Sequence, residues 1–218
     1  WSPASQVNAG GDRVFRESTS SDDASLSYYA NNPVGNILNI LFFRNCIPAL
    51  TMMIRKQILE NIGGFHQEFG LPLVDIPTLQ LLATKGTFFY DPIPTGMWRV
   101  YPDQVTKSHL VTIFEGCHQL AKRNLDEFSK NDALTFQVKE EEIDSWYHRM
   151  MVIAHARQGR YCLIRKQFPE ARSHYLKAIF KWKGEYIWKV RALTGILFSV
   201  FHLDVEGLAR MLNRPNYK

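Results

Sequence analysis

One acidic residue lies in a setting that favours proton transfer. Asp75 follows Leu73 and Val74 and precedes Ile76 and Pro77, so the segment around it is apolar apart from the carboxyl group. A carboxylate in such surroundings is desolvated, which raises its pKa and suits it to act as a general base. An aspartate just before a helix is also an ordinary N-cap that accepts backbone N–H bonds. Both interpretations of Asp75 stay open at this point.

A second candidate is the guanidinium of Arg99. It lies in the run Trp98-Arg99-Val100-Tyr101-Pro102, where a predicted strand enters a loop. A guanidinium matches phosphate oxygens in a bidentate geometry, so Arg99 could hold a diphosphate. A structural ion pair is the alternative.

Several other chemistries have no motif in this sequence. The seven histidines show no metal-ligand spacing with nearby acids, and there is no Gly-rich phosphate loop, H-E-x-x-H, G-x-S-x-G or Asp-x-Asp. The three cysteines, Cys46, Cys117 and Cys162, are too far apart to predict a disulfide framework or a zinc site. Their sparse use favours a reducing, cytoplasmic compartment.

Length and composition indicate a folded protein. The 218 residues carry 26 Lys and Arg against 21 Asp and Glu, and 45% are hydrophobic, which excludes a disordered or collagenous chain. No apolar run reaches the roughly 18 residues of a membrane span, and no signal peptide is visible. We therefore expect a cytoplasmic protein that is at most peripheral to the inner face of the membrane. The sequence opens at Trp1 instead of Met, so we also expect it to be part of a longer protein.

Residues 1–105 predict an α/β fold with a small mixed sheet, because they are rich in Gly, Pro, Asn and aromatic residues and have short apolar runs. Helices are expected over residues 33–43, 56–62 and 77–84, and Gly63-Gly64 is expected to end the second. Strands are expected over residues 12–16, 48–55, 87–90 and 95–101, with 48–55 as a buried strand. A loop is expected over residues 65–73.

Residues 106–218 predict an all-α region, because turn formers are few and apolar residues repeat with the helical period. Helices are expected over residues 106–128, 143–158, 160–166, 169–181, 186–202 and 205–212, with residues 129–142 as a linker or a helix start. The sequence thus predicts two domains, an α/β domain over residues 1–105 and a basic helical bundle over residues 106–218.

One local pattern has the spacing of a tetratricopeptide helix pair. Gly159, Ala171, Tyr175 and Ala178 occupy its small and aromatic positions. A solenoid needs about three such units, and one is visible, so a single helical hairpin packed on its neighbours is favoured.

The final third of the chain is strongly basic. From Tyr147 onward there are fourteen Lys and Arg against four Asp and Glu, and Phe180, Trp182, Tyr186 and Trp188 lie among the lysines. Basic helices with Trp and Tyr suit an anionic membrane surface, and they also suit nucleic acid. A solvated face on an ordinary bundle is the third interpretation. No sequence-reading motif is present, so we do not expect nucleic acid as a partner.

The order of features between Cys46 and Ser108 resembles the second half of a family 2 glycosyltransferase with a GT-A type fold. In that family a strand ending in Arg leads to a helix and then to Gly-Gly-Phe, which corresponds here to residues 48–55 and to Ile62-Gly63-Gly64-Phe65. A Glu-Asp pair then heads the next helix, and its Asp is the catalytic base; Val74-Asp75 stands at that place.

The later features of the family follow in the same order. A helix that ends in a basic residue and Gly corresponds to residues 79–86, and an aromatic strand corresponds to Phe88-Phe89-Tyr90. The family's Arg-x-His-Pro segment corresponds to Arg99-Val100-Tyr101-Pro102 and is followed by a helix start over residues 103–108.

The sequence departs from the family pattern at three positions. Val74 replaces the Glu of the pair, Tyr101 replaces the His that often helps to bind the metal, and Pro77 stands where a second acid is common. The nucleotide-binding half with its Asp-x-Asp motif is also absent. The resemblance therefore implies a divalent cation, Mg or Mn, only together with that half, and none bound by this chain alone. By itself the chain is not expected to transfer sugar.

The resemblance implies the acceptor-side part of an inverting transferase that moves a sugar from a nucleotide-sugar donor to a polysaccharide or lipid-linked acceptor. Asp75 would be the catalytic base. The acceptor and donor would meet the side chains of the 65–73 loop and of the strand end, which are Phe65, His66, Trp98, Arg99 and Tyr101. The family is active in cell-surface polysaccharide synthesis, and the basic tail would hold the enzyme at a membrane that carries the acceptor. The alternative is a catalytically inactive helical interaction or scaffold module at a membrane surface, which the residues at positions 74, 77 and 101 favour.

Overall fold

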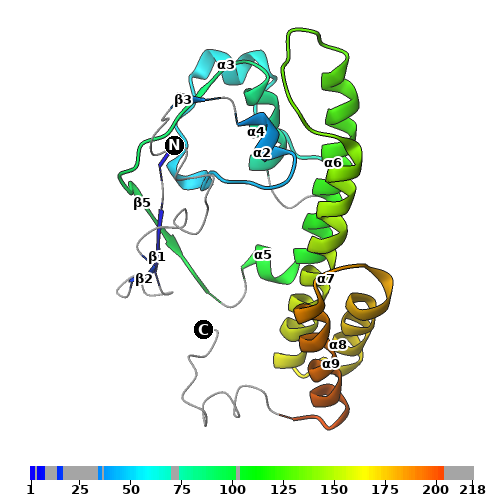
Figure 1. Cartoon of the computed structure of the whole chain (residues 1–218). Helices are drawn as coiled ribbons and strands as arrows, with labels where there is room; N and C mark the ends of the chain where they lie inside the picture. Colours follow the sequence, from blue (N-terminus) through cyan, green and yellow to red (C-terminus); the bar gives the residue numbers. More distant parts are fainter. Residues whose placement is uncertain are drawn as a thin grey trace. The chain divides into compact units, whose positions relative to one another are not determined.

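The computed structural model describes residues 1–2, 4–7, 14–16, 34–35, 37–69, 74–101 and 104–203 (Figure 1). The chain divides into two compact units, the first made of residues 1–101 and 120–140 and the second of residues 102–119 and 141–218. The sequence predicts a domain boundary after residue 105, which is close to residue 102, where the chain first passes from the first unit to the second. Residues 120–140 differ from that prediction, because they group with the first unit.

The first unit contains two small sheets. Strands β1 (Ala4–Val7), β2 (Val14–Arg16) and β5 (Gly96–Arg99) form a sheet in the order β2-β1-β5, in which β1 pairs antiparallel with β2 and parallel with β5. Strands β3 (Val34–Gly35) and β4 (Phe88–Phe89) pair antiparallel. The first unit is thus a mixed α/β structure, as the sequence predicts, while the described chain as a whole is largely helical.

The helices of the first unit surround an apolar core. They are α2 (Leu38–Leu41), the 3-10 helix η1 (Ala49–Thr51), α3 (Lys56–Asn61), α4 (Asp75–Ala83) and the second half of α6 (Leu110–Ser129). Their buried side chains include Leu38, Leu41, Phe42, Leu79 and Leu120. The predicted end of α3 is confirmed, because Gly63 and Gly64 both have positive φ and the Gly64 N–H bonds the Leu59 carbonyl at 2.9 Å.

The prediction of a buried strand over residues 48–55 is wrong. Residues 49–51 form η1, no strand is assigned to residues 52–55, and Met53 is 95% exposed. Pro48 has no N–H for a strand ladder, and its carbonyl accepts the Thr51 N–H at 3.0 Å and the Thr51 hydroxyl at 3.0 Å. These local bonds turn the backbone where the apolar pattern alone predicts an extended chain.

The predicted helix over residues 33–43 is correct only in its second half. Val34–Gly35 pairs with β4, and the helix is limited to Leu38–Leu41. A short apolar run fits either structure, and here pairing with Phe88–Phe89 decides in favour of a strand at its start.

The second unit is helical. It contains α5 (Val105–Ser108), the first half of α6, α7 (Glu140–Ile164) from residue 141 onward, α8 (Phe168–Leu176), the π-helix η2 (Lys177–Lys181) and α9 (Tyr186–Val200). The predicted helix over residues 205–212 lies outside the described residues. The predicted helix over residues 106–128 is interrupted at His109, where the Ser108 hydroxyl bonds the His109 ring at 2.8 Å and the backbone leaves helical geometry.

The predicted break at Gly159 is wrong, because α7 runs through it without interruption. A Cβ at position 159 would lie 2.7 Å from the Tyr175 ring, and one at position 195 would lie 2.3 Å from the same ring. Gly159 on α7 and Gly195 on α9 therefore allow both helices to contact Tyr175 of α8. The glycine at position 159 serves close packing and not helix termination. Ala171, Ala178 and Ala192 are fully buried in the same core, as expected for a tightly packed helical hairpin with a further helix against it.

Candidate functional site

Asp75 is the first residue of α4, and its side chain is half-buried. The helix has no side-chain cap at its start, so Asp75 is not the N-cap that residue type alone allows. Its Oδ2 accepts a 2.7 Å hydrogen bond from Nδ2 of Asn45. Its Oδ1 is buried and accepts no hydrogen bond within the described part of the chain. One oxygen is therefore fixed and the other keeps its capacity to accept a proton.

Burial raises the pKa of the Asp75 carboxyl group above its ordinary value, as its apolar neighbours in the sequence predict. The N–H groups of Ile76 and Asp75 itself, and the Asn45 amide, act more weakly in the opposite direction. The Asn45 amide is oriented by its other end, because Oδ1 of Asn45 accepts the Ile47 N–H at 2.8 Å. Nδ2 must then face the carboxylate, and a donor in that place favours its ionised form.

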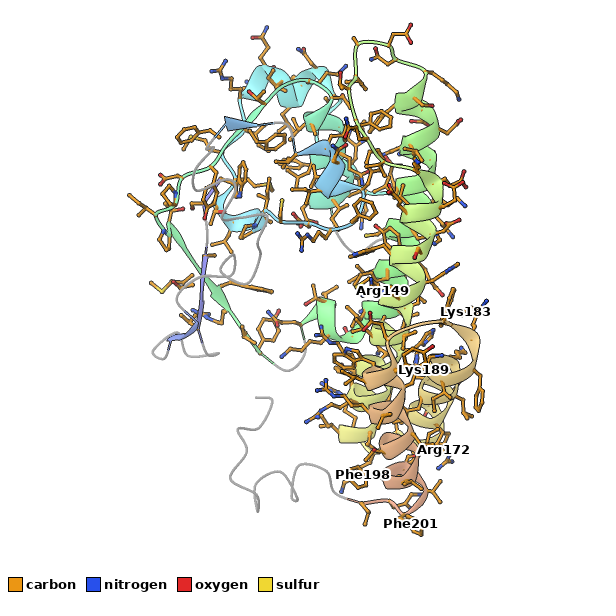
Figure 2. All side chains as sticks on the ribbon, viewed as in Figure 1. Arg149, Arg172, Lys183, Lys189, Phe198 and Phe201 are labelled. Carbon is orange, nitrogen blue, oxygen red and sulfur yellow. The ribbon has the colours of Figure 1, made fainter. Side chains whose placement is uncertain are left out.

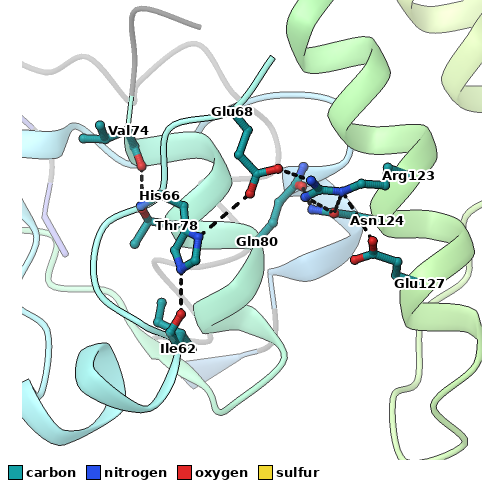
Figure 3. Close-up of polar contacts among 9 residues, drawn as sticks. All are labelled: Ile62, His66, Glu68, Val74, Thr78, Gln80, Arg123, Asn124 and Glu127. Atoms are coloured by element: carbon teal, nitrogen blue, oxygen red, sulfur yellow. Dashed lines mark hydrogen bonds and ion pairs between the residues drawn. The ribbon is translucent and has the colours of Figure 1, made fainter. Parts of the chain in front are cut away.

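His66 ties the loop after α3 to the start of α4. Its backbone N–H donates to the Thr78 hydroxyl at 3.0 Å, and that hydroxyl donates to the Val74 carbonyl at 2.5 Å (Figure 3). The His66 Nε2 lies 2.6 Å from the Ile62 carbonyl, so the proton is on Nε2. His66 therefore positions the loop beside the residue that precedes Asp75, while the neighbouring Phe65 is 60% exposed.

A buried polar network, which the sequence analysis missed, holds α4 in place. Nε and Nη2 of Arg123 donate to the Asn124 amide oxygen at 3.0 and 2.8 Å, and Asn124 donates to Gln80 at 2.6 Å (Figure 3). Gln80 donates in turn to the Leu41 carbonyl at 2.8 Å, and Arg123 also pairs with Glu68. Gln80 and Asn124 are fully buried, so the network fixes α4 against α2 and α6. The sequence feature that could have indicated this network is Gln80, because its amide lies in a mostly apolar helical segment.

The other predicted site residues lie on a different element. Trp98 and Arg99 are on β5, paired with Gln6 and Val7 of β1, and Tyr101 follows the strand. All three side chains are exposed. Figure 1 shows β5 and α4 at separate places in the first unit. The structure thus brings Asp75 and His66 to the same helix start and leaves Trp98, Arg99 and Tyr101 on the strand.

The described residues of the first unit line a small hollow and a wider one. One of about 30 Å³, enough for a water-sized group, is lined by residues that include Ile47, Met52 and Leu79. A wider and more open one of about 450 Å³ is lined by residues of α6 and of the following loop, including Lys122 and Phe136. Asp75 lines neither of them.

In the second unit two histidines face each other, and spacing alone did not single them out. Nδ1 of His155 on α7 lies 3.0 Å from Nδ1 of His174 on α8, so one ring donates and the other accepts. Burial, followed by the neighbouring His174, Lys177 and Lys181, lowers the pKa of His155 to about 4, and burial also lowers the pKa of His174. Both rings are therefore neutral at pH 7, and they join α7 to α8.

The described residues contain no cluster of three or more His, Cys, Asp or Glu side chains that could hold a metal ion. No helix among them is long and apolar enough to cross a membrane. Cys46, Cys117 and Cys162 form no disulfide within the described residues.

No protein-family model, curated protein or solved structure matches this chain.

Proposed function

We propose that this chain is the acceptor-side part of an inverting glycosyltransferase in which Asp75 is the general base. The observation that carries the proposal is the state of the half-buried Asp75 carboxylate, which has a raised pKa and one enclosed oxygen without a hydrogen bond among the described residues. A carboxylate oxygen with a raised pKa and no hydrogen-bond donor can accept the proton of a hydroxyl group that reaches it. The order of features from residue 48 to residue 108, which resembles family 2 glycosyltransferases, also supports it.

The resemblance to family 2 glycosyltransferases implies the chemical step. Oδ1 of Asp75 takes the proton of an acceptor hydroxyl while the hydroxyl oxygen attacks the anomeric carbon of the donor sugar. The bond between that carbon and the diphosphate oxygen breaks, and the nucleoside diphosphate leaves with the electron pair on the opposite face, which inverts the anomeric carbon. Asn45 holds Oδ2 in place throughout, and the protonated carboxyl group later returns its proton to water.

The acceptor is a saccharide, either a polysaccharide end or a lipid-linked sugar. Phe65 beside the start of α4, and Trp98 and Tyr101 on the strand side, expose aromatic faces on which a sugar ring can stack. The nucleotide-sugar would be held by a further part of the protein that carries the Asp-x-Asp motif.

The test is sugar transfer by the protein that joins this chain to the nucleotide-binding half. We expect the Asp75→Asn variant to lose transfer by at least about 100-fold while donor binding stays unchanged, because only the proton acceptor is removed. Asp132→Asn is the matched control, since Asp132 is an exposed carboxylate in the loop after α6. An active wild type with an equally active Asp75→Asn variant would remove Asp75 from the mechanism. A wild type that does not bind nucleotide-sugar would refute the transferase function.

A second candidate function, a helical interaction or scaffold module, is favoured by one observation. The last described helix, α9, leaves a row of apolar side chains exposed. This function needs no catalysis by Asp75, so loss of donor binding together with retained association through α9 would distinguish it from the transferase.

A further inference from the structure

Helix α9 exposes a continuous apolar face, here called the α9 stripe. It is made of side chains with exposed fractions between 53% and 79%, namely Tyr186, Ile187, Val190, Leu193, Leu197, Val200 and Phe201, the last at the helix end. An α-helix turns by about 100° per residue, so residues 186, 190, 193, 197 and 200 follow one line along it. The side chains that α9 buries, Ala192 and Ser199, lie on the opposite face together with Gly195.

The stripe is thus opposite the face that packs on Tyr175, and it is not part of the helical core. Contiguous exposed apolar patches mark contact surfaces for other molecules. Phe180 of η2 is also 79% exposed, shortly before the start of α9, and adds an aromatic ring to the exposed apolar side chains.

The charges around the stripe indicate what kind of surface it meets. Residues 147–203 contain eleven Lys and Arg but only two acids, Glu170 and Glu185, and α9 itself has no acid. Figure 2 shows Arg149 and Lys183 toward the start of α9, and Arg172 and Phe201 toward its end. Lys189 and Arg191 extend from α9 on either side of the stripe, at about 80° and 120° from its centre.

The partners of these cations leave the positive charge in excess. Arg149 is paired with Glu185 at 2.8 Å, and the Lys189 ammonium donates to the carbonyls of Ile179 and Trp182 at 2.9 and 2.6 Å, which are dipoles without net charge. Arg157 and Arg191 both lie over the Trp188 ring, at 5.2 and 4.7 Å. An apolar face with aromatic residues, in a region where cations outnumber acids, is the pattern of a helix that lies in the interface of an anionic bilayer.

We propose that the second unit docks on an anionic lipid surface through the α9 stripe. Helix α9 has 15 residues and is about 22 Å long, so it is shorter than the roughly 30 Å hydrocarbon core and would lie along the surface. The apolar side chains enter the acyl boundary, and the cations of α7, α8 and α9 contact lipid headgroups. This docking does not depend on catalysis by Asp75, so its test and the transfer assay can fail separately.

The test is binding of the full chain to vesicles, one set of phosphatidylcholine alone and one with added phosphatidylserine. We expect binding to the anionic vesicles only, weakened as salt is raised, and reduced at least about tenfold in Leu197→Asp. Ser145→Asp adds the same charge at an exposed position of α7 and is the matched control, expected to bind nearly as the wild type does. Circular dichroism of both variants checks that the helices are retained.

Three results would overturn the proposal. The first is equal binding of Leu197→Asp and wild type, and the second is binding to neutral vesicles as strong as to anionic ones. The third is absence of binding to any vesicle. In that case the α9 stripe has another occupant, either residues 204–218 or a second copy of the chain. Sedimentation velocity identifies the second copy, as self-association that Leu197→Asp abolishes.

Discussion

The amide of Asn45 donates to Oδ2 of Asp75 over 2.7 Å, and the same side chain accepts the Ile47 N–H through its own oxygen. Asn45 precedes η1 and Asp75 begins α4, so the bond joins two parts of the first unit that are 30 residues apart. It satisfies one carboxylate oxygen and leaves the other without a hydrogen bond within the described residues. This arrangement fixes the position of the carboxylate through Oδ2 and leaves Oδ1 without a hydrogen-bond donor among the described residues.

We predict that Asp75→Asn raises the free energy of unfolding at pH 7, by about 1 kcal/mol. Burial raises the pKa of Asp75 in the folded chain, so the ionised carboxylate lowers the free energy of unfolding. This loss is present at neutral pH and is absent below the ordinary pKa, where the carboxyl group is protonated in both states. The gain should therefore shrink as the pH falls from the raised pKa of the folded chain towards the ordinary value of 3.8, and it should be absent below that value. Urea denaturation at pH 7 and at pH 3 measures it, with Asp132→Asn as control. A variant less stable than the wild type at pH 7 would contradict the prediction.

We predict that Gly159→Ala and Gly195→Ala each destabilise the second unit, by roughly 1–3 kcal/mol. Alanine normally stabilises a helix relative to glycine, but a Cβ at either position would overlap the Tyr175 ring. Gly86→Ala is the control, because a Cβ there meets nothing within 4 Å. Thermal denaturation followed by circular dichroism compares the three variants. Stabilised Gly159 and Gly195 variants would show that the ring is not in contact with these helices.

We predict that Asn124→Leu destabilises the first unit by about 1–3 kcal/mol, because it leaves the buried oxygen of Gln80 without its donor. The double variant Gln80→Leu with Asn124→Leu should cost less than the sum of the two single changes, since it removes both partners. Gln119→Leu, at an exposed position of α6, serves as control. Additive costs in chemical denaturation would mean that the two amides do not interact.

We predict that wild-type stability falls as the pH drops from about 6.5 towards 4 and that His155→Gln weakens this fall. The pKa of His155 is lowered to about 4, so the unfolded chain takes up a proton over this range before the folded chain does. Denaturation midpoints at pH 7, 5.5 and 4.5 give the slope, and His109→Gln, at an exposed histidine, is the control. Parallel slopes for the wild type and His155→Gln would exclude His155 as the cause.

Sequence patterns predicted the elements with local signals. The double glycine at positions 63 and 64 predicted the end of α3, and the helical period predicted α8 and α9 closely. The small and aromatic spacing correctly predicted that Gly159 and Tyr175 pack together, but the helix break expected at Gly159 was wrong, because the glycine serves this contact inside a continuous helix. The short apolar runs at residues 33–43 and 48–55 fit a helix or a strand equally, so pattern alone could not separate them.

The candidate site was predictable in part. The apolar neighbours of Asp75 correctly indicated burial and a raised pKa, but its partner Asn45 lies 30 residues away and has no sequence signal of its own. The same is true of Arg123 and Asn124, which act on α4 from another helix. Local sequence indicates which residue is desolvated, whereas only the fold indicates which residues position it.

The central claim is that the half-buried carboxyl group of Asp75 has a raised pKa and can accept a proton. The most direct measurement is an NMR titration of its side-chain carboxyl carbon in the full chain, with the Asn45→Ala variant beside it. We expect a wild-type pKa above the ordinary 3.8, raised further in Asn45→Ala because a donor to the ionised form is lost. A wild-type midpoint at or below the ordinary value would contradict the account.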